Sequence, residues 1–369
     1  MRFHVLAVPH AITIPEYSSC AFTQKVWKLC KMLKTEGHEV LHYGHLLSKV
    51  ECDENIAVVL PQELERSYPG WDWRKQSFPP FKKTDECYRQ FYRRAARAIR
   101  RRFQPGDFLL CSFGDWHRDV ADALKDLPIA VVESGIGYPS GSFANYRVFE
   151  SYAVMHAYQG QGAIAHSTNN FWYDAVIPNF FDLTQFEYCD KKDDFFLFLG
   201  RVGAHKGVNM AIQVAEYTKT RLIIAGTGDR IHENELITCV GNVGPEERKN
   251  LLSKAKATIC MSTFLEPFCG VQIESMLSGT PVISADRGAF AEYNLQGKTG
   301  YRCRSFEHIA YAVRNLDKID PAYCREWAEQ FSMENIAPRY TDYFLSVYDI
   351  AMGRGGFYAE RPERTCLFG

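Results

Sequence analysis

Long apolar runs are missing from this chain. No stretch reaches the roughly 18 consecutive apolar residues of a membrane-spanning helix, and the apolar run within residues 1–9 is too short for the core of a signal peptide. A strong net charge is missing as well, since 43 basic side chains stand against 44 acidic ones. The net charge of -1 gives no overall attraction to nucleic acid. These absences predict a cytoplasmic protein that does not bind nucleic acid.

Metal-binding patterns are missing too. The twelve cysteines are scattered from Cys20 to Cys366, with no Cys-x-x-Cys pair and no His/Cys cluster at zinc-ligand spacing. They indicate unpaired thiols in a reducing compartment. No Asp-x-Asp triplet occurs, so the usual carboxylate pair for a divalent cation on a nucleotide diphosphate is absent. We therefore expect no metal and no resident cofactor, with basic side chains neutralising any diphosphate.

The length of 369 residues is enough for two hydrophobic cores. Predicted strands and helices alternate on both sides of a polar stretch at 188–194, which is the best linker candidate. Such alternation favours parallel strands joined by crossing helices, with ligands at the carboxyl ends of the strands. The sequence thus predicts two doubly wound α/β domains with a ligand site in the cleft between them.

The predicted elements follow apolar runs and helix boundary signals. In the first half we expect strands at 3–8, 39–43, 107–111, 129–133, 163–166 and 175–177, and helices near 18–34, 86–103, 116–126 and 145–157. In the second half we expect strands at 195–199, 221–225, 237–240, 258–261 and 281–284, and helices near 207–218, 245–254, 270–278 and 305–316.

Two carboxylates eight positions apart, Glu266 and Glu274, flank the start of a predicted helix. The unpaired amides and the positive dipole end of such a helix start favour an anion. The residues at this junction are Phe268, Cys269, Gly270 and Val271. In such a site the backbone would hold a phosphate, and the carboxylate on either side would hold hydroxyl groups. This combination is suited to a nucleotide sugar.

Two further segments follow strands of the second half. The segment 200–207 carries Arg201 and Lys206, which could neutralise a diphosphate without metal, although a solvated surface turn is the plainer interpretation. After the next strands come Gly226 and Gly228, and then Gly241, Asn242 and Val243. The backbone of this last group could meet a base, and an ordinary strand-to-helix loop is the alternative.

Together these segments resemble family 4 of the retaining glycosyltransferases, which have the GT-B fold. The resemblance covers most of the second half, and its motifs are specific in their joint order and spacing. They are Gly200-Arg201 with Lys206-Gly207, Gly226-x-Gly228, the Glu-x7-Glu pattern of Glu266 and Glu274, Gly279-Thr280-Pro281-Val282-Ile283, Glu292, Gly300, and Phe331-Ser332-Met333-Glu334. The family often has glycine where this chain has Cys269, which would matter if the position needs a positive φ.

The resemblance implies two Rossmann-like domains that face each other across a cleft. Residues 1–187 would form an acceptor-binding domain, which a returning helix at 333–352 would join. Residues 188–332 would form a donor-binding domain, and residues 353–369 would form a tail. Arg201 and Lys206 would bind the donor diphosphate, Glu266 the hydroxyls of the transferred sugar and Glu274 the ribose. Amides from Phe268 to Val271 would bind phosphate or sugar.

The first half matches the family less closely. His117 follows a predicted strand where related enzymes often place a histidine near the sugar, with Asp115 as the second candidate and a helix cap or packed ring as the alternative. Glu133 also ends a strand and could bind acceptor hydroxyls. Ser18 and Ser19 could face the phosphates or simply cap a helix. Seven arginines from Arg89 to Arg102 make a basic helix that could touch anionic lipid, although a solvated face is the default.

The sequence therefore predicts a metal-independent retaining glycosyltransferase. It would move a sugar from a nucleotide diphosphate to a hydroxyl of a glycan, glycolipid or glycoprotein, in the cytoplasm and with peripheral membrane contact as an option. A nucleotide-sugar epimerase of the same fold and a catalytically silent sugar-binding protein are the alternatives. The donor base, the sugar, the acceptor and the oligomeric state do not follow from the sequence.

Overall fold

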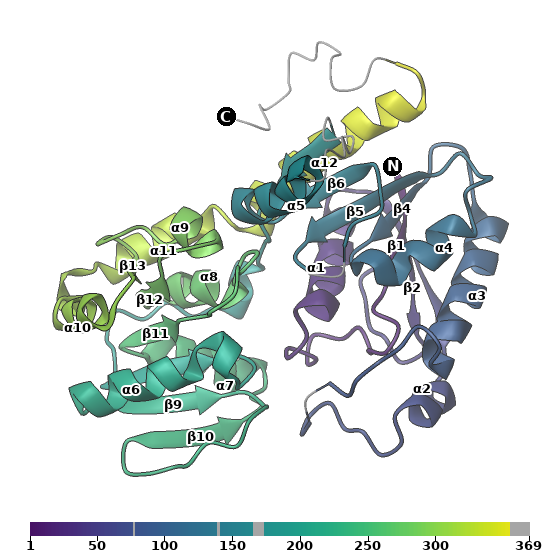
Figure 1. Ribbon diagram of the computed structural model, residues 1–369. Coiled ribbons are helices and arrows are strands. Elements are labelled where there is room, and N and C mark those ends of the chain that lie inside the picture. The colour runs from purple at the N-terminus through teal and green to yellow at the C-terminus, as the bar shows by residue number, and fades with distance from the viewer. Residues whose placement is uncertain (77, 139–140, 165–172, 355–369) are drawn as a thin grey trace. The chain divides into compact units, whose positions relative to one another are not determined.

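The chain folds into two compact units, each built around its own sheet (Figure 1). The computed structural model describes residues 1–76, 78–138, 141–164 and 173–354. The first unit comprises residues 1–71, 79–180 and 333 onward, and the second comprises 72–78 and 181–332. The functional labels of the two expected domains stay predictions, and the predicted tail lies outside the described residues from 355 on.

The first unit contains a seven-stranded sheet in the order β3-β2-β1-β4-β5-β6-β7, and every neighbouring pair is parallel. Its strands are β1 (Arg2–Leu6), β2 (Glu39–His45), β3 (Glu54–Val59), β4 (Phe108–Cys111), β5 (Ala130–Ile136), β6 (Tyr146–Phe149) and β7 (Asp174–Val176). The strands are apolar and mostly buried, as expected for parallel strands that are covered on both faces.

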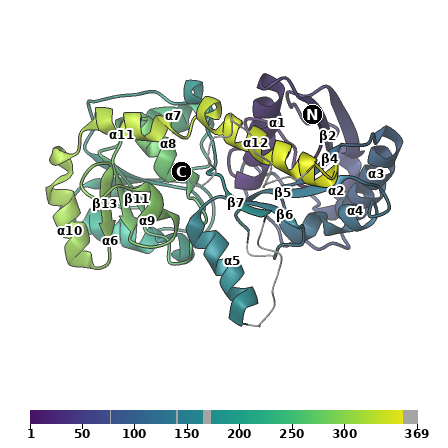
Figure 2. The same cartoon turned by 90° about the horizontal axis from the view of Figure 1, so that it is seen from above.

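Helices cover this sheet. They are α1 (Ala21–Thr35), α2 (Pro61–Ser67), α3 (Glu86–Arg102), α4 (Arg118–Asp122), α5 (Tyr152–Ile164) and α12 (Met333–Ala351), with a short 3-10 turn η1 (Gly114–His117). Although α12 follows the second unit in sequence, its apolar side packs in the first unit against α1 and β5 (Figure 2). The last helix is therefore part of the first unit's core.

The second unit contains a six-stranded parallel sheet in the order β10-β9-β8-β11-β12-β13. Its strands are β8 (Phe195–Leu199), β9 (Arg221–Ala225), β10 (Ile237–Gly241), β11 (Ala257–Cys260), β12 (Val282–Ala285) and β13 (Gly300–Cys303). Its helices are α6 (Val208–Thr218), α7 (Pro245–Lys254), α8 (Gly270–Leu277), α9 (Ala289–Tyr293), α10 (Phe306–Arg314) and α11 (Pro321–Glu329), with 3-10 turns η3 (Leu183–Gln185), η4 (Ala204–Lys206) and η5 (Leu316–Lys318).

Some expected elements differ from the structure. The predicted helix at 145–157 is wrong over its first part, where Arg147, Val148 and Phe149 are strand residues, and α5 begins only at Tyr152. The strand predicted at 163–166 is wrong over 163–164, which end α5, while 165–166 lie outside the described residues. The predicted serine cap of α1 is also wrong, because Cys20 holds the N-cap position and no side chain caps this helix.

Candidate functional site

The predicted donor residues all follow carboxyl ends of strands in the second unit. Because this sheet is wholly parallel, those ends meet at one edge. There the segment 200–207 follows β8, 226–228 follows β9, 241–243 ends β10 and 262–270 follows β11. The fold therefore brings the sequence motifs together on one side of one sheet.

Close backbone contact explains the glycines after β9. The backbone N–H groups of Gly200 and Val202 donate to Ala225 and Thr227, both at 2.9 Å. A Cβ on Gly226 would lie 1.8 Å from the carbonyl oxygen of Gly200. The two loops could therefore not form these backbone hydrogen bonds if residue 226 carried a side chain. Gly226 is therefore needed for the packing of the two loops, and its amide donates to Gly241 at 2.6 Å.

Lys206 and Glu266 form an ion pair at this edge. The Nζ of Lys206 lies 2.7 Å from Oε1 of Glu266, and the hydroxyl of Ser262 donates to the same oxygen at 2.6 Å. The side chain of Glu266 is 5% exposed and that of Lys206 is 32% exposed. No described residue donates to Oε2 of Glu266. The pair thus holds the carboxylate in place while one oxygen and two ammonium hydrogens remain available.

Glu274 lies on α8 and pairs with an arginine that the sequence analysis did not select. Its Oε1 contacts the guanidinium of Arg248 on α7 and comes near the backbone of Gly270, where a Cβ would be 3.5 Å away. Its Oε2 is buried and has no hydrogen-bond partner among the described residues. A buried carboxylate oxygen without a partner is costly unless a ligand donates to it.

One sequence signal could have identified Arg248. The residue lies in the first turn of the predicted helix at 245–254. A cation is unfavourable at this positive end of the helix dipole. Its position there is a weak signal of a carboxylate partner, which the structure shows to be Glu274.

The start of α8 presents free amides between the two glutamates. Cys269 adopts φ 60° and ψ 77°, the left-handed region, directly before Gly270. The backbone N–H groups of Cys269, Gly270 and Val271 donate to none of the described residues. The ring of Phe268 packs in the core against Phe181, so only its backbone can serve a ligand. Free amides at a helix start are the arrangement that favours an anion, and anion binding at this junction stays a prediction.

The Cys269 side chain is not a nucleophile in this state. A hydrogen bond with Cys260 and then burial hold the pKa of its thiol well above the ordinary value. The thiol therefore stays protonated, and it packs against the core of the second unit.

The remaining predicted donor residues differ in exposure. Arg201 is exposed, and its side chain makes no hydrogen bond or ion pair with any residue that the structure describes. Asn242 is half-buried, whereas Val243 belongs to the core. Arg201 is thus an available cation, and Val243 could contribute only through its backbone.

His117 is buried in the first unit. Its Nε2 donates to the carbonyl of Ala7 at 3.0 Å, and its ring stacks on Phe91. Burial lowers its pKa to about 4, so the ring is neutral at pH 7. Nδ1 is then an acceptor without a partner among the described residues.

The other predicted acceptor residues are engaged or exposed. Asp115 pairs with Arg118 at 2.5 Å and with Lys83 at 3.3 Å. Glu133 is buried and accepts from Tyr138, Ser142 and the amides of Phe143 and Ala144. These bonds hold Tyr138 and residues 142–144 in place, so acceptor binding by Glu133 stays a prediction that would require some of them to break.

The two serines before α1 differ in exposure. Ser19 is exposed and Ser18 is half-buried, and the amide of Ser18 donates to Glu16 at 2.8 Å. Their predicted role at a phosphate remains open.

A model of a known protein family matches the part of the chain that forms this edge of the second sheet. Residues 182–330 match the family model described as glycosyl transferases group 1. This part of the chain is similar to that family. The resemblance predicted from the motifs is thereby confirmed for the second unit of the protein.

Curated relatives match this chain over a limited length. Spore coat protein SA of Bacillus subtilis is 26% identical over 180 residues, which are 42% of this chain and 48% of that protein. Glycogen synthase of Mycobacterium tuberculosis is 33% identical over 144 residues, 34% of each chain. The chain therefore spans about half the length, or less, of these relatives.

Solved structures match over nearly the whole chain. Sucrose-phosphate synthase from Thermosynechococcus elongatus aligns with a TM-score of 0.69 at 17% identity, covering 95% of this chain and 100% of that one. Anabaena HepE in complex with UDP-glucose aligns with a TM-score of 0.65 at 14% identity, covering 94% and 100%. These likenesses confirm the predicted GT-B fold.

Within the described residues, no helix combines the length and the apolar character needed to cross a bilayer. The same residues contain no group of three or more His, Cys, Asp or Glu side chains suited to hold a metal ion.

Proposed function

We propose that this protein is a retaining glycosyltransferase that takes its sugar from a uridine diphosphate donor. The observation that carries the proposal is the pair of glutamates around the start of α8. Glu266 and Glu274 each keep one carboxylate oxygen without a partner, and the free amides of Cys269, Gly270 and Val271 lie between them in sequence. These two carboxylate oxygens can accept hydrogen bonds from hydroxyl groups on either side of an anion site. This arrangement matches a nucleotide diphosphate sugar.

The choice of uridine rests on a structural neighbour. Anabaena HepE has been solved with UDP, with UDP and glucose, and with UDP-glucose. We transfer this base to the present chain because the same sheet edge offers backbone at Gly241 and Asn242, at the end of β10 and next to the loop that follows β9.

Each side chain then has a distinct role. Oε2 of Glu274 accepts from a ribose hydroxyl, and Oε2 of Glu266 accepts from a hydroxyl of the transferred sugar. Lys206 can keep its bond to Glu266 and still donate to a phosphate oxygen, because an ammonium group has three hydrogens. Arg201 and the amides at the start of α8 add further positive potential.

These groups stabilise the negative charge on the leaving diphosphate. As the bond between the sugar and the phosphate breaks, negative charge develops on the phosphate oxygens, and cations and amides that are already in place lower the barrier. The thiol of Cys269, at the start of α8, is protonated and is therefore not available as a nucleophile. A front-face transfer, in which the departing phosphate helps to take the acceptor proton, is consistent with retention of the anomeric configuration.

The acceptor side of the proposal is less constrained. We assign acceptor binding to the first unit, where the neutral ring of His117 offers Nδ1 as an acceptor of a hydroxyl. Basic side chains of α3 are the candidates for contact with an anionic membrane surface or a phosphorylated acceptor. The cytoplasmic location stays a prediction.

A single incubation separates this proposal from its rivals. Labelled UDP-sugars are mixed with the protein in EDTA, with and without a panel of glycan and lipid acceptors, and the products are resolved by anomer. Transfer with retained configuration supports the proposal. Formation of an epimer without acceptor would identify an epimerase, and binding with neither transfer nor slow hydrolysis would identify a silent sugar-binding protein.

A further inference from the structure

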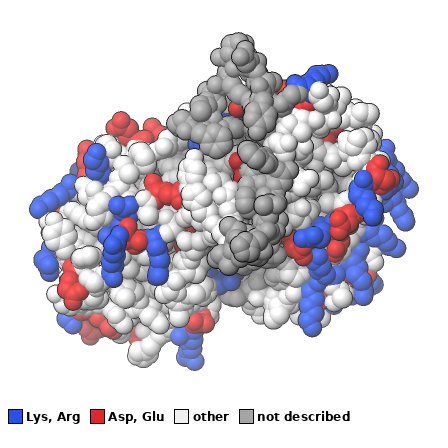
Figure 3. Space-filling model, turned by 45° about the horizontal axis from the view of Figure 1, so that its top comes forward, with Lys and Arg blue, Asp and Glu red and all other residues white. Residues whose placement is uncertain are grey.

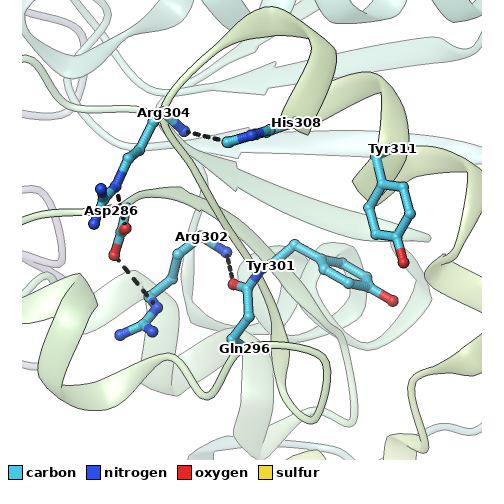
Figure 4. A pocket seen from close by; sticks show the side chains of 7 residues that line it. All are labelled: Asp286, Gln296, Tyr301, Arg302, Arg304, His308 and Tyr311. Carbon is cyan, nitrogen blue, oxygen red and sulfur yellow. Dashed lines mark hydrogen bonds and ion pairs between the residues drawn. The ribbon is translucent and has the colours of Figure 1, made fainter.

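A hollow of about 530 Å³ lies at the outer strand of the second sheet, away from the residues assigned to the donor. Figure 4 shows its two sides, with Tyr301 and Tyr311 on one and Asp286, Arg302 and Arg304 on the other. Its volume falls in the range of roughly 300–1,000 Å³ typical of sites for small ligands. None of the roles proposed above uses it.

The charged side of the hollow has spare positive charge. Asp286 accepts from Nε of Arg304 at 2.6 Å and lies 3.5 Å from Nε of Arg302. Two guanidinium groups therefore share one carboxylate. The Arg304 side chain is 76% exposed, and its two terminal nitrogens donate to none of the described residues. This open fork matches a carboxylate, sulfate or phosphate group.

The aromatic side presents a fixed ring pair. Tyr301 and Tyr311 meet edge to face, with ring centroids 5.9 Å apart and planes at 88°. The hydroxyl of Tyr301 donates to the carbonyl of Asn315 at 3.1 Å, which fixes its ring. Tyr311 is 54% exposed, so its ring is accessible to a ligand. Because Tyr301 is only 6% exposed and its hydroxyl is engaged, Tyr311 offers the accessible ring, which could pack against the apolar face of a sugar and keep its hydroxyl for hydrogen bonding.

Polar side chains complete the lining between the two sides. The Oε1 of Gln296 accepts from the amide of Arg302 at 2.6 Å, which leaves the NH2 group of Gln296 as a donor. The Nδ1 of His308 accepts from the amide of Arg304 at 3.4 Å, which leaves Nε2–H as a second donor. Both donors are thus held in fixed orientations by the outer strand β13.

We propose that this hollow binds an acidic saccharide, a sugar ring that carries a carboxylate, sulfate or phosphate group. A neutral sugar would leave the fork of Arg304 unused, and a small inorganic anion would leave the two tyrosines unused. Only a ligand with a ring face and an anionic substituent engages both sides of the hollow.

The loop after β12 joins this hollow to the donor residues. Asp286 lies in the hollow, whereas the next residue, Arg287, donates to the carbonyl of Ser262 at 3.0 Å. The amide of Ala289 donates to the carbonyl of Glu266 at 3.2 Å. The saccharide held here would be a distant part of the acceptor or product glycan. Its identity as part of that glycan rests on the proposed function, whereas the binding of an acidic saccharide does not.

The test is a binding measurement that needs no catalysis. Oligosaccharides bearing glucuronate, sulfate or phosphate are immobilised, each beside its neutral parent, and the full-length protein is applied with inorganic phosphate as a competitor. We expect an acidic member to bind at least about tenfold more tightly than its parent, as one charged hydrogen bond requires. Binding should weaken as salt rises, because Arg304 is exposed.

Variants assign the binding to the hollow. Arg304→Ala should abolish the preference for the acidic member, and Tyr311→Ala should weaken acidic and neutral members alike. Arg221→Ala and Tyr217→Ala are matched controls, because both residues are exposed and neither lines the hollow. Lys206→Ala should retain binding even where transfer is lost, which separates this inference from the proposed function.

Three results would overturn the proposal. The first is that no acidic member binds more tightly than its neutral parent. The second is that Arg304→Ala, shown by its melting temperature to be folded, binds as the wild type does. The third is that inorganic phosphate displaces the saccharide from wild type and Tyr311→Ala equally well, which would show a simple anion site without a sugar-binding face.

Discussion

The carboxylate of Glu266 is buried beside a single cation, which makes this pair sensitive to the loss of either partner. Lys206 and Ser262 both donate to one oxygen, and no other described residue compensates the charge. Removing Lys206 therefore has two effects, one on the fold and one on the chemistry, and they can be measured apart.

Lys206→Ala should lower the rate of transfer about 100-fold or more, the loss seen when one preorganised charge-stabilising donor is removed. It should also lower the melting temperature, because Glu266 stays buried without its counter-ion. The double variant Lys206→Ala/Glu266→Gln should recover the melting temperature and remain inactive. Arg201→Ala is the control, since this exposed side chain should affect transfer without affecting stability. Wild-type activity in Lys206→Ala would contradict the assignment.

The backbone of Cys269 provides a second prediction. A side chain at φ 60° is strained by its Cβ, so Cys269→Gly should be more stable than Cys269→Ala by about 1 kcal/mol. The comparison uses Ala because both variants lose the thiol and its bond to Cys260, and they differ only in the Cβ. Chemical denaturation measures the difference, and equal stability of the two variants would show that the position carries no strain.

Cys269 and Arg248 mark what the sequence could reveal about the site. The comparison with the family pattern identified Cys269 as a residue in a place where glycine is common, and the structure shows the positive φ that explains the glycine. Arg248 was not identified, because its contact with Glu274 joins two helices across 26 positions of sequence. The spacing of motif residues predicts contacts within one loop, whereas a contact between two helices depends on how the helices pack.

At the scale of elements, α7 and α8 are joined through this same ion pair. Arg248 on α7 orients the carboxylate of Glu274 on α8, so it acts as a positioning residue. Arg248→Ala should weaken UDP binding about tenfold, the loss expected for one charged hydrogen bond, and leave the rate at saturating donor nearly unchanged. Arg248→Lys should restore part of the affinity. A fall in the saturated rate with unchanged affinity would contradict this role.

Helix α3 carries a row of exposed arginines at a spacing of four, which places them on one face. The row consists of Arg89, Arg93, Arg97 and Arg101. Figure 3 shows Lys and Arg side chains gathered on the side of the first unit where α3 lies. Arg97 and Arg101 make no ion pair with the described residues, whereas their neighbours Arg100 and Arg102 pair with Asp126 and Glu54.

We therefore expect full-length protein to sediment with vesicles rich in anionic lipid at low salt and to be released as salt rises. The variant Arg97→Ala/Arg101→Ala should lose most of this binding, and Arg221→Ala/Lys318→Ala should keep it. Absence of binding to anionic vesicles at low salt would show that the row is only a solvated face.

The elements of the second half were predicted more closely than those of the first. Strands such as Phe195–Leu199 and Arg221–Ala225 are short apolar runs ending in glycine, and their boundaries follow from the sequence. In the first half, Tyr146–Phe149 and α5 were read as one helix. Arg147 pairs with Asp174 of the neighbouring strand at 2.7 Å, and this long-range contact selects a strand where the local pattern is ambiguous.

At the scale of the whole molecule, burial lowers the pKa of five described histidines in the first unit, one of which is His45. The pKa falls to about 3 for His10 and to about 4 for His38, His42 and His117. The unfolded chain binds these protons near pH 6.5, whereas the folded chain does not until pH 4 or below. Stability is therefore full above pH 6.5 and falls as the pH drops from 6.5 toward 4.

The first unit should accordingly unfold at lower urea concentration at pH 5 than at pH 7. A fully buried histidine of this kind contributes about 2 kcal/mol to the difference. Hydrogen exchange assigns the change to the first unit, and His117→Gln should reduce the pH dependence by about one proton. An equal acid effect on both units, or an unchanged slope in His117→Gln, would contradict this explanation.

The central claim is that Glu274 holds the ribose and Glu266 the transferred sugar of one UDP-sugar bound without metal. Calorimetric titration of UDP and UDP-glucose in EDTA, with wild type and both Glu→Gln variants, tests it most directly. We expect Glu274→Gln to weaken the binding of both ligands, and Glu266→Gln to weaken UDP-glucose and leave UDP bound as tightly or more tightly. Failure of wild type to bind either ligand, or an equal effect of Glu266→Gln on both, would contradict it.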